Sequence, residues 1–235
     1  MVEPPTNRQS GATDLADPNL ESIPPALVSG GLVGSFRAAI AGVLRTIASQ
    51  RNMKIHTLSG LMVFIVGMTL PLGLDVRVAL VFAVAIVWFA EILNTALEAF
   101  VDLHIRTYHR LAMMAKDAAA AGVLILACAT VLVLAEILYT QWHLVTDNLP
   151  AVQRAVLFGV PCVLLEALGL VVVRRGALAV VRLLVSLGLL APLVATAEDP
   201  FFAALAVWVV LTAAYARWSF PRMARAGGTR LVVGP

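Results

Sequence analysis

Three acids and an amide recur at helical spacing beside one of the most apolar stretches of this sequence. Residues 90–102 read AEILNTALEAFVD and continue the run VRVALVFAVAIVWFA. At about 100° per residue, the four polar side chains would fall within an arc of about 100° on one face of a helix. They are Glu91, Asn94, Glu98 and Asp102.

An acid near the centre of a bilayer costs roughly 2.5–3.5 kcal/mol on insertion scales. Several acids on one face therefore need a shared compensation, such as a cation, a basic partner or a water-filled site. They could pair with nearby basic residues and only lock helix packing. An ionisable residue inside a membrane nevertheless indicates a functional site first.

Two further polar clusters lie near the ends of neighbouring apolar runs. Lys116 and Asp117 open the run after the stripe, and SQRNMKIH, with Gln50 and Lys54, precedes the run before it. Carboxylate oxygens suit Mg²⁺, basic side chains suit phosphoryl oxygens, and a spare carboxylate can act as a general base. Together these residue types predict phosphate chemistry.

The elements that must position these residues are membrane helices. The 235 residues are 60% hydrophobic and only 13% charged, with a mean hydropathy of +0.91, which is typical of the membrane class. Continuous apolar runs near the ~20 residues needed to cross a bilayer predict spanning helices. The predicted spans are Thr57–Leu74, Val76–Phe100, Ala118–Thr140, Arg154–Val173, Ala177–Ala197 and Phe201–Ser219.

The ends of the chain predict two other kinds of segment. Residues 1–30 are polar and proline-rich, which indicates a disordered tail. Leu32–Gln50 places apolar residues at helical spacing among arginines, which predicts an amphipathic helix on the membrane surface. All lysines and arginines except Arg77 and Arg154 then fall on one side, so we expect both termini to be cytoplasmic.

The string EILNTALEAFVD, followed fourteen residues later by KD, resembles the prokaryotic membrane diacylglycerol kinase and undecaprenol kinase family. RNMKIH resembles the undecaprenol kinase branch, and the resemblance covers about Ser35 to Tyr139. It implies a three-span core with an amphipathic N-terminal helix, usually a homotrimer in a bacterial inner membrane. It also implies transfer of the γ-phosphoryl of MgATP to the hydroxyl of a membrane lipid, at a cytoplasmic site between subunits.

The resemblance also implies roles for individual residues. Glu91 would be the general base, Asn94 would orient the site and Asp102 would support it. Glu98 would hold Mg²⁺, and Gln50 stands where many family members have a second metal-binding glutamate, so it brings no charge. The residues implied in binding ATP are Tyr108, His109, Lys116 and Asp117.

The sequence therefore predicts an all-α integral membrane protein in three parts. A tail over residues 1–30 precedes a kinase-like core over 31–140, and three additional spans over 141–235 have no assigned role. Undecaprenol and diacylglycerol both remain open as substrates, and we expect no nucleic acid partner. A non-catalytic scaffold on the same core, or a transporter, is the alternative function.

Overall fold

The computed structural model describes residues 31–105, 107–172 and 176–227, with side chains as far as Ser219. The tail predicted for residues 1–30 lies outside these residues. The chain divides into two compact units, Met1–Ile40 and Ala41–Pro235. All contacts described below lie within the second unit.

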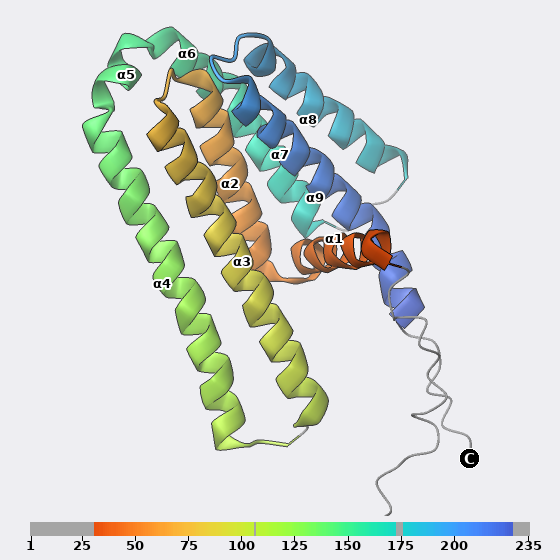
Figure 1. The fold of residues 1–235 in the computed structure, drawn as a ribbon. Helices are drawn as coiled ribbons and strands as arrows, with labels where there is room; N and C mark the ends of the chain where they lie inside the picture. Colours follow the sequence, from red (N-terminus) through yellow and green to blue (C-terminus); the bar gives the residue numbers. More distant parts are fainter. Residues whose placement is uncertain (1–30, 106, 173–175, 228–235) are drawn as a thin grey trace, which may run out of the picture. The chain divides into compact units, whose positions relative to one another are not determined.

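Throughout the described residues the chain is helical and contains no strand, which confirms the predicted all-α membrane fold (Figure 1). The stretch from α6 through a π-helical turn, η1, to α7 is continuous and corresponds to one predicted span. The helices are α1 Gly31–Ser49, α2 Arg51–Thr69, α3 Leu74–His104, α4 Arg110–Thr140, α5 Trp142–Asp147, α6 Leu149–Arg154, η1 Ala155–Gly159, α7 Val160–Val171, α8 Ala177–Ala195 and α9 Pro200–Gly227.

The boundaries predicted for the first span, Thr57–Leu74, are wrong. The helix α2 begins at Arg51 and ends at Thr69. Pro71 explains the early end, because proline disfavours helix in the residue before it and lacks the N–H that would continue the hydrogen bonding. Each of the remaining predicted spans coincides with one helix or with the continuous α6–η1–α7 stretch, except at two ends (Figure 1). The helix α8 ends at Ala195 and not at Ala197, and Val173 lies outside the described residues.

Six of the described helices are long and apolar enough to cross a membrane, but they include α1 and not α2. The helix α2 packs against α3 on one side and against α7, α8 and α9 elsewhere. A helix covered by protein on several faces can carry polar and small residues, such as Thr57 and Gly60, that would be unfavourable facing lipid. Surface placement of α1 remains a prediction.

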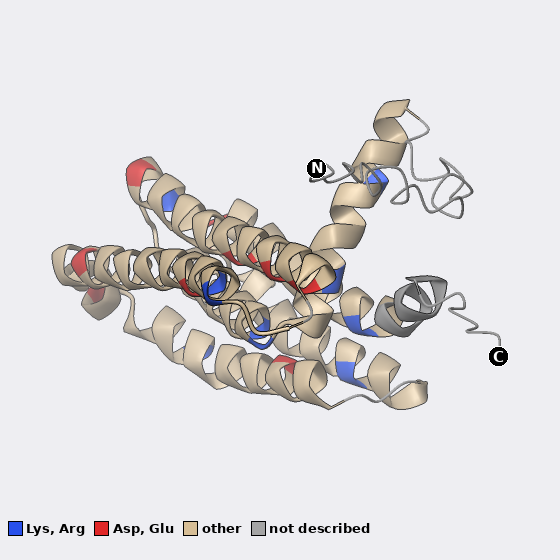
Figure 2. Cartoon of the chain, turned by 90° about the horizontal axis from the view of Figure 1, so that it is seen from below, with Lys and Arg blue, Asp and Glu red and all other residues tan. Residues whose placement is uncertain are grey.

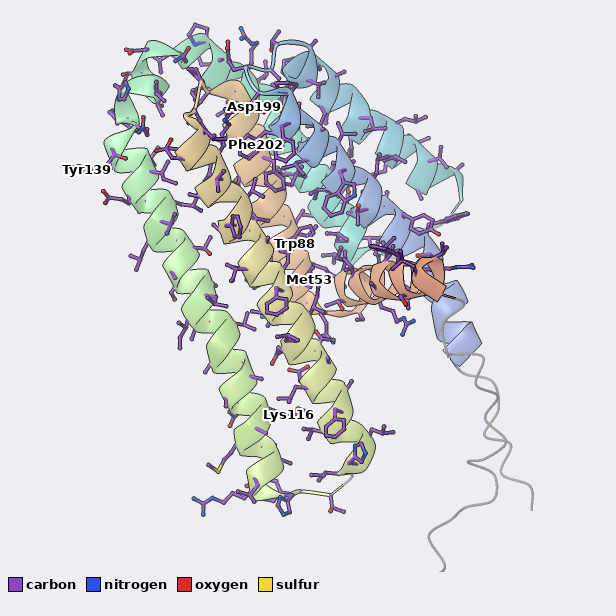
Figure 3. All side chains as sticks on the ribbon, viewed as in Figure 1. Met53, Trp88, Lys116, Tyr139, Asp199 and Phe202 are labelled. Carbon is purple, nitrogen blue, oxygen red and sulfur yellow. The ribbon has the colours of Figure 1, made fainter. Side chains whose placement is uncertain are left out.

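The core around α2 joins helices from both halves of the chain. Phe64 of α2 and Phe202 of α9 lie with ring centroids 5.8 Å apart, and Met68 and Val209 are buried in the same cluster. Phe202 also packs against Gly67, where a Cβ atom would come within 3.2 Å of its ring. Residues after 140 thus share one core with residues before it (Figure 3).

Charged positions are sparse along the bundle (Figure 2). Arg77, one of the two basic residues that fall on the other side in the predicted topology, forms an ion pair. Arg77, near the start of α3, lies 2.6 Å from Asp199, which precedes α9. Asp199 also accepts hydrogen bonds from the N–H groups of Phe201 and Phe202. Burial would raise the pKa of Asp199, but these partners outweigh it and hold the pKa below its usual value.

Candidate active site

Burial changes steadily along the polar stripe of α3. Glu91 and Asn94 are only 2% and 6% exposed, Glu98 is half-buried, and Asp102 near the helix end is exposed. The stripe therefore runs from the protein interior to the connection between α3 and α4. All four polar residues lie on the single helix α3, as the sequence predicts.

The face of α3 that carries Glu91 is covered by α2. Trp88, three residues before Glu91, donates its indole N–H to the carbonyl of His56, at 3.2 Å. One turn earlier, Val84 lies so close to Gly60 that a Cβ atom there would be 2.9 Å from it. Because residues three and four apart share a helix face, α2 extends over the position of Glu91. Trp88 is thus a positioning residue for the site. The sequence does not reveal this role, because Trp88 is one apolar residue within an apolar run.

The hydrogen bonds inside the stripe leave two buried oxygens without a partner. Asn94 donates through Nδ2 to Oε1 of Glu98, at 3.0 Å. Oε2 of Glu91 and Oδ1 of Asn94 are buried and accept no hydrogen bond in the described structure. A buried acceptor without a partner costs roughly 1–3 kcal/mol. These two atoms are therefore available to a hydroxyl donor or a cation.

Lys116 brings α4 to the exposed end of the stripe (Figure 3). Its Nζ lies 2.9 Å from Oδ1 of Asp102, and the two side chains are 30% and 65% exposed. Water screens an ion pair this exposed, so it contributes little to stability. The ammonium has three donors, so Lys116 can hold Asp102 and still donate to a phosphate.

The other residues expected to bind the nucleotide are not gathered on the stripe. Asp117 is exposed and follows Lys116 on α4, so it points about 100° away from it. Tyr108 is 83% exposed, and His109, also exposed, directly precedes α4. One chain therefore presents a stripe with Lys116, and the remaining side chains face outward.

Gln50 and Lys54 of the cluster SQRNMKIH, which covers the α1–α2 junction and the start of α2, have separate positions. Gln50 is half-buried and extended, with φ −84° and ψ 130°, between α1 and α2. Lys54 lies close enough to Arg217 of α9 for their charges to interact, which places it toward the second half of the chain. Among the described residues no three His, Cys, Asp or Glu side chains form a group that could hold a metal ion.

Comparison with known proteins decides the family. The model of the prokaryotic diacylglycerol kinase family matches residues 37–138. The chain is 34% identical over 93 residues to the undecaprenol kinase of Bacillus subtilis (strain 168), covering 40% of this chain and 76% of that protein. This chain belongs to the prokaryotic diacylglycerol kinase family.

The kinase-family match has clear limits. A diacylglycerol kinase of Synechocystis sp. (strain ATCC 27184 / PCC 6803 / Kazusa) is 44% identical over 107 residues, which are 45% of this chain and 61% of that protein. No solved structure matches. The family match includes the α3 stripe and Lys116 and ends before α5, so α5 to α9 lie beyond it.

Proposed function

We propose that this protein is a bacterial membrane lipid kinase that transfers the γ-phosphoryl of ATP, with Mg²⁺, to the hydroxyl of undecaprenol or diacylglycerol. The observation that carries the proposal is the buried carboxylate of Glu91. Its Oε2 atom has no hydrogen-bond partner, and it lies on the same helix face as Glu98 and Asp102 in a chain of this family. Both relatives are named as lipid kinases.

In the proposed reaction Oε2 of Glu91 accepts the proton of the lipid hydroxyl as its oxygen attacks the γ-phosphorus. The bond between the γ-phosphorus and the bridging oxygen breaks, and ADP leaves. Asn94 donates to Glu98 through its amide N–H, whereas Oε2 of Glu91 has no partner and stays free to take the proton. Glu91 lies about three helical turns inside Asp102, at a depth suited to a lipid hydroxyl.

The donor set fits Mg²⁺, which usually takes one or two carboxylates and fills its other positions with water and phosphate oxygens. Glu98 would hold the ion, and the neutral amide oxygen of Gln50 would be a weaker second ligand. Bound Mg²⁺ neutralises charge that develops on the phosphates during transfer. Lys116 would donate to the same phosphates from the end of the stripe.

The outward positions of Asp117, Tyr108 and His109 motivate the proposed assembly. These nucleotide-binding candidates are exposed in one chain, so a neighbouring chain could present them to another chain's stripe. A homotrimer, with ATP entering from the cytoplasm and both termini on that side of the inner membrane, is the arrangement we propose. RNMKIH at the start of α2 favours undecaprenol as the substrate.

The test uses vesicles that contain the full-length protein, labelled MgATP and either undecaprenol or diacylglycerol. We expect label in one of the two lipids. Label in neither lipid, with folded protein, would contradict the proposal and leave a non-catalytic scaffold, which the neutral Gln50 also favours.

A further inference from the structure

A cavity of about 810 Å³ lies among α7, α8 and α9, outside the kinase-family match. Its walls are mainly aliphatic, including Leu165, Leu168, Leu183 and Leu211. In a membrane bundle, such a space can accept a hydrocarbon chain from the surrounding lipid. The cavity lining includes Val172 and Gly176, which flank the connection from α7 to α8.

Two arginines line this apolar cavity, and they have different surroundings. Arg182 of α8 lies 2.6 Å from Glu166 of α7, which also accepts a hydrogen bond from Ser186, at 2.7 Å. Arg182 and Ser186 of α8 thus hold both oxygens of Glu166. This carboxylate is fully used by α8.

Arg217 of α9 has no such partner. Its Nη1 donates to the carbonyl of Ala48 at 3.3 Å, whereas Nη2 is buried and makes no hydrogen bond in the described structure. Within the described part of the chain, no carboxylate forms an ion pair with Arg217. Its charge is close enough to Arg182 and Lys54 for repulsion. Of these three cations only Arg182 has a carboxylate partner, so Arg217 and Lys54 carry positive charge without an ion pair in the described structure.

Aromatic residues indicate where the cavity lies relative to the membrane surface. Tyr215 and Trp218 line it beside Arg217, with ring centroids 6.0 Å apart, and each is 51% exposed. Tyrosine and tryptophan are enriched where a bilayer meets water, at the level of lipid headgroups. The arginines of the cavity therefore lie near headgroup depth, and its leucines extend toward the hydrocarbon.

We infer that this cavity binds an anionic lipid with a terminal phosphate monoester, whose phosphate lies at Arg182 and Arg217 and whose chain lies along the leucines. A phosphate monoester carries about 1.5–2 negative charges near neutral pH, which would offset the unpaired charge of Arg217 and that of its neighbour Lys54. Guanidinium groups bind phosphate oxygens through paired N–H donors. The inference uses no residue of the α3 stripe, so it stands or fails separately from the proposed kinase activity.

The experiment measures lipid binding to the full-length chain in detergent by native mass spectrometry, without ATP. The probes are dioleoyl phosphatidic acid and dioleoyl phosphatidylglycerol, which share their chains but differ in having a monoester or a diester phosphate. We expect phosphatidic acid to bind about tenfold more tightly, as one additional charge-assisted contact would give. Equal binding of the two lipids would overturn the inference, and this comparison needs no variant.

Single substitutions test where on the protein the lipid binds. R217Q should reduce phosphatidic acid binding about tenfold, whereas R45Q, which removes an exposed arginine of α1, should not change it. K116Q should also leave it unchanged, because Lys116 belongs to the α3 site. Loss in K116Q with retention in R217Q would instead place the lipid at the kinase site. Displacement by inorganic phosphate at the same concentration would show that the lipid chain contributes nothing, and would also overturn the inference.

Discussion

At the scale of single residues, the buried carboxylate of Glu91 and the neutral amide of Gln50 matter most for the proposed chemistry. Glu91 lies under α2 with one oxygen free of hydrogen bonds. Gln50 stands between α1 and α2 where the family resemblance implies an acid. In the proposed reaction Glu91 supplies the base, and Gln50 limits the charge available to a metal.

Replacing Glu91 by glutamine should remove the base and preserve the shape of the side chain. We expect E91Q to lower phosphoryl transfer by about 10²–10⁴-fold, the usual contribution of a general base. Transfer of labelled phosphate to lipid measures the effect. The control is E136Q, the same change at an exposed position of α4. Wild-type activity in E91Q, with E136Q also active, would exclude Glu91 as the base.

Restoring an acid at position 50 should strengthen metal binding. We expect Q50E to lower the Mg²⁺ concentration for half-maximal activity several-fold, because a carboxylate adds a charged oxygen ligand. Activity measured across Mg²⁺ concentrations at saturating ATP tests this. The matched control is Q141E, at the far end of α4. An unchanged Mg²⁺ requirement in Q50E would remove Gln50 from the metal site.

At the scale of the elements, contacts between helix ends and between helix faces position α3. Arg77 and Asp199 connect the beginning of α3 to the beginning of α9. Gly60 lets α2 approach α3 near Trp88. Both contacts act on the helix that carries the stripe, at points away from its acids.

The Arg77–Asp199 pair should make stability depend on pH in the acid range. The pKa of Asp199 is lowered in the folded state, so its contribution is complete above the unfolded pKa of about 4. It is lost as the pH falls further, through the folded pKa. D199N should lower stability by roughly 1.5–3 kcal/mol at neutral pH and flatten this acid dependence. Thermal unfolding in detergent from pH 7 to pH 3 measures both effects.

The control for this change is E198Q, which removes the neighbouring exposed acid. It should unfold like the wild type at each pH. The same loss in both variants would indicate a general charge effect and contradict the role assigned to Asp199.

Adding one methyl group at Gly60 should separate α2 from α3. The new Cβ atom would lie 2.9 Å from Val84 Cγ1, and β-branched valine has little rotamer freedom in a helix. We expect G60A to destabilise the protein by about 1–3 kcal/mol, as overpacking does. G122A is the control, because a Cβ atom there meets nothing within 4 Å. Unchanged thermal unfolding of G60A would show that the two helices tolerate a wider spacing.

At the scale of the whole molecule, the three additional spans are part of the core that holds α2. Phe202 and Val209 of α9 are buried with Phe64 and Met68, although the family match ends at residue 138. The proposed kinase core thus has a structural partner that the matched region of the family does not include.

A chain that ends at residue 145 should be less stable than the complete chain. It would expose the α2 face that now contacts α9, and lipid or detergent would replace well-packed protein there. We expect a lower midpoint of thermal unfolding and more aggregation on size-exclusion chromatography. Removal of residues 228–235 alone is the control. A truncated chain as stable as the complete one would show that α2 and α3 hold their positions without α9.

The sequence alone was sufficient for features that depend on local periodicity and hydropathy. Four polar residues at helical spacing placed a stripe on one face of a helix, and long apolar runs predicted the helical membrane fold. A string of charged residues at fixed spacing indicated the family. These signals lie within single segments, so no contact between segments is needed to detect them.

The tertiary structure decided which side chains meet. Spacing along α7 does not show which basic residue meets Glu166, and the packing of α7 on α8 brings Arg182 to it. The sequence predicted only that Lys54 lies on the same membrane face as the acids, and the structure adds that Lys54 lies near Arg217. Trp88 looked like an ordinary apolar residue, but it places α2 over Glu91. Such pairings depend on how helices far apart in the sequence are rotated against one another, and hydropathy and spacing within one helix do not contain that information.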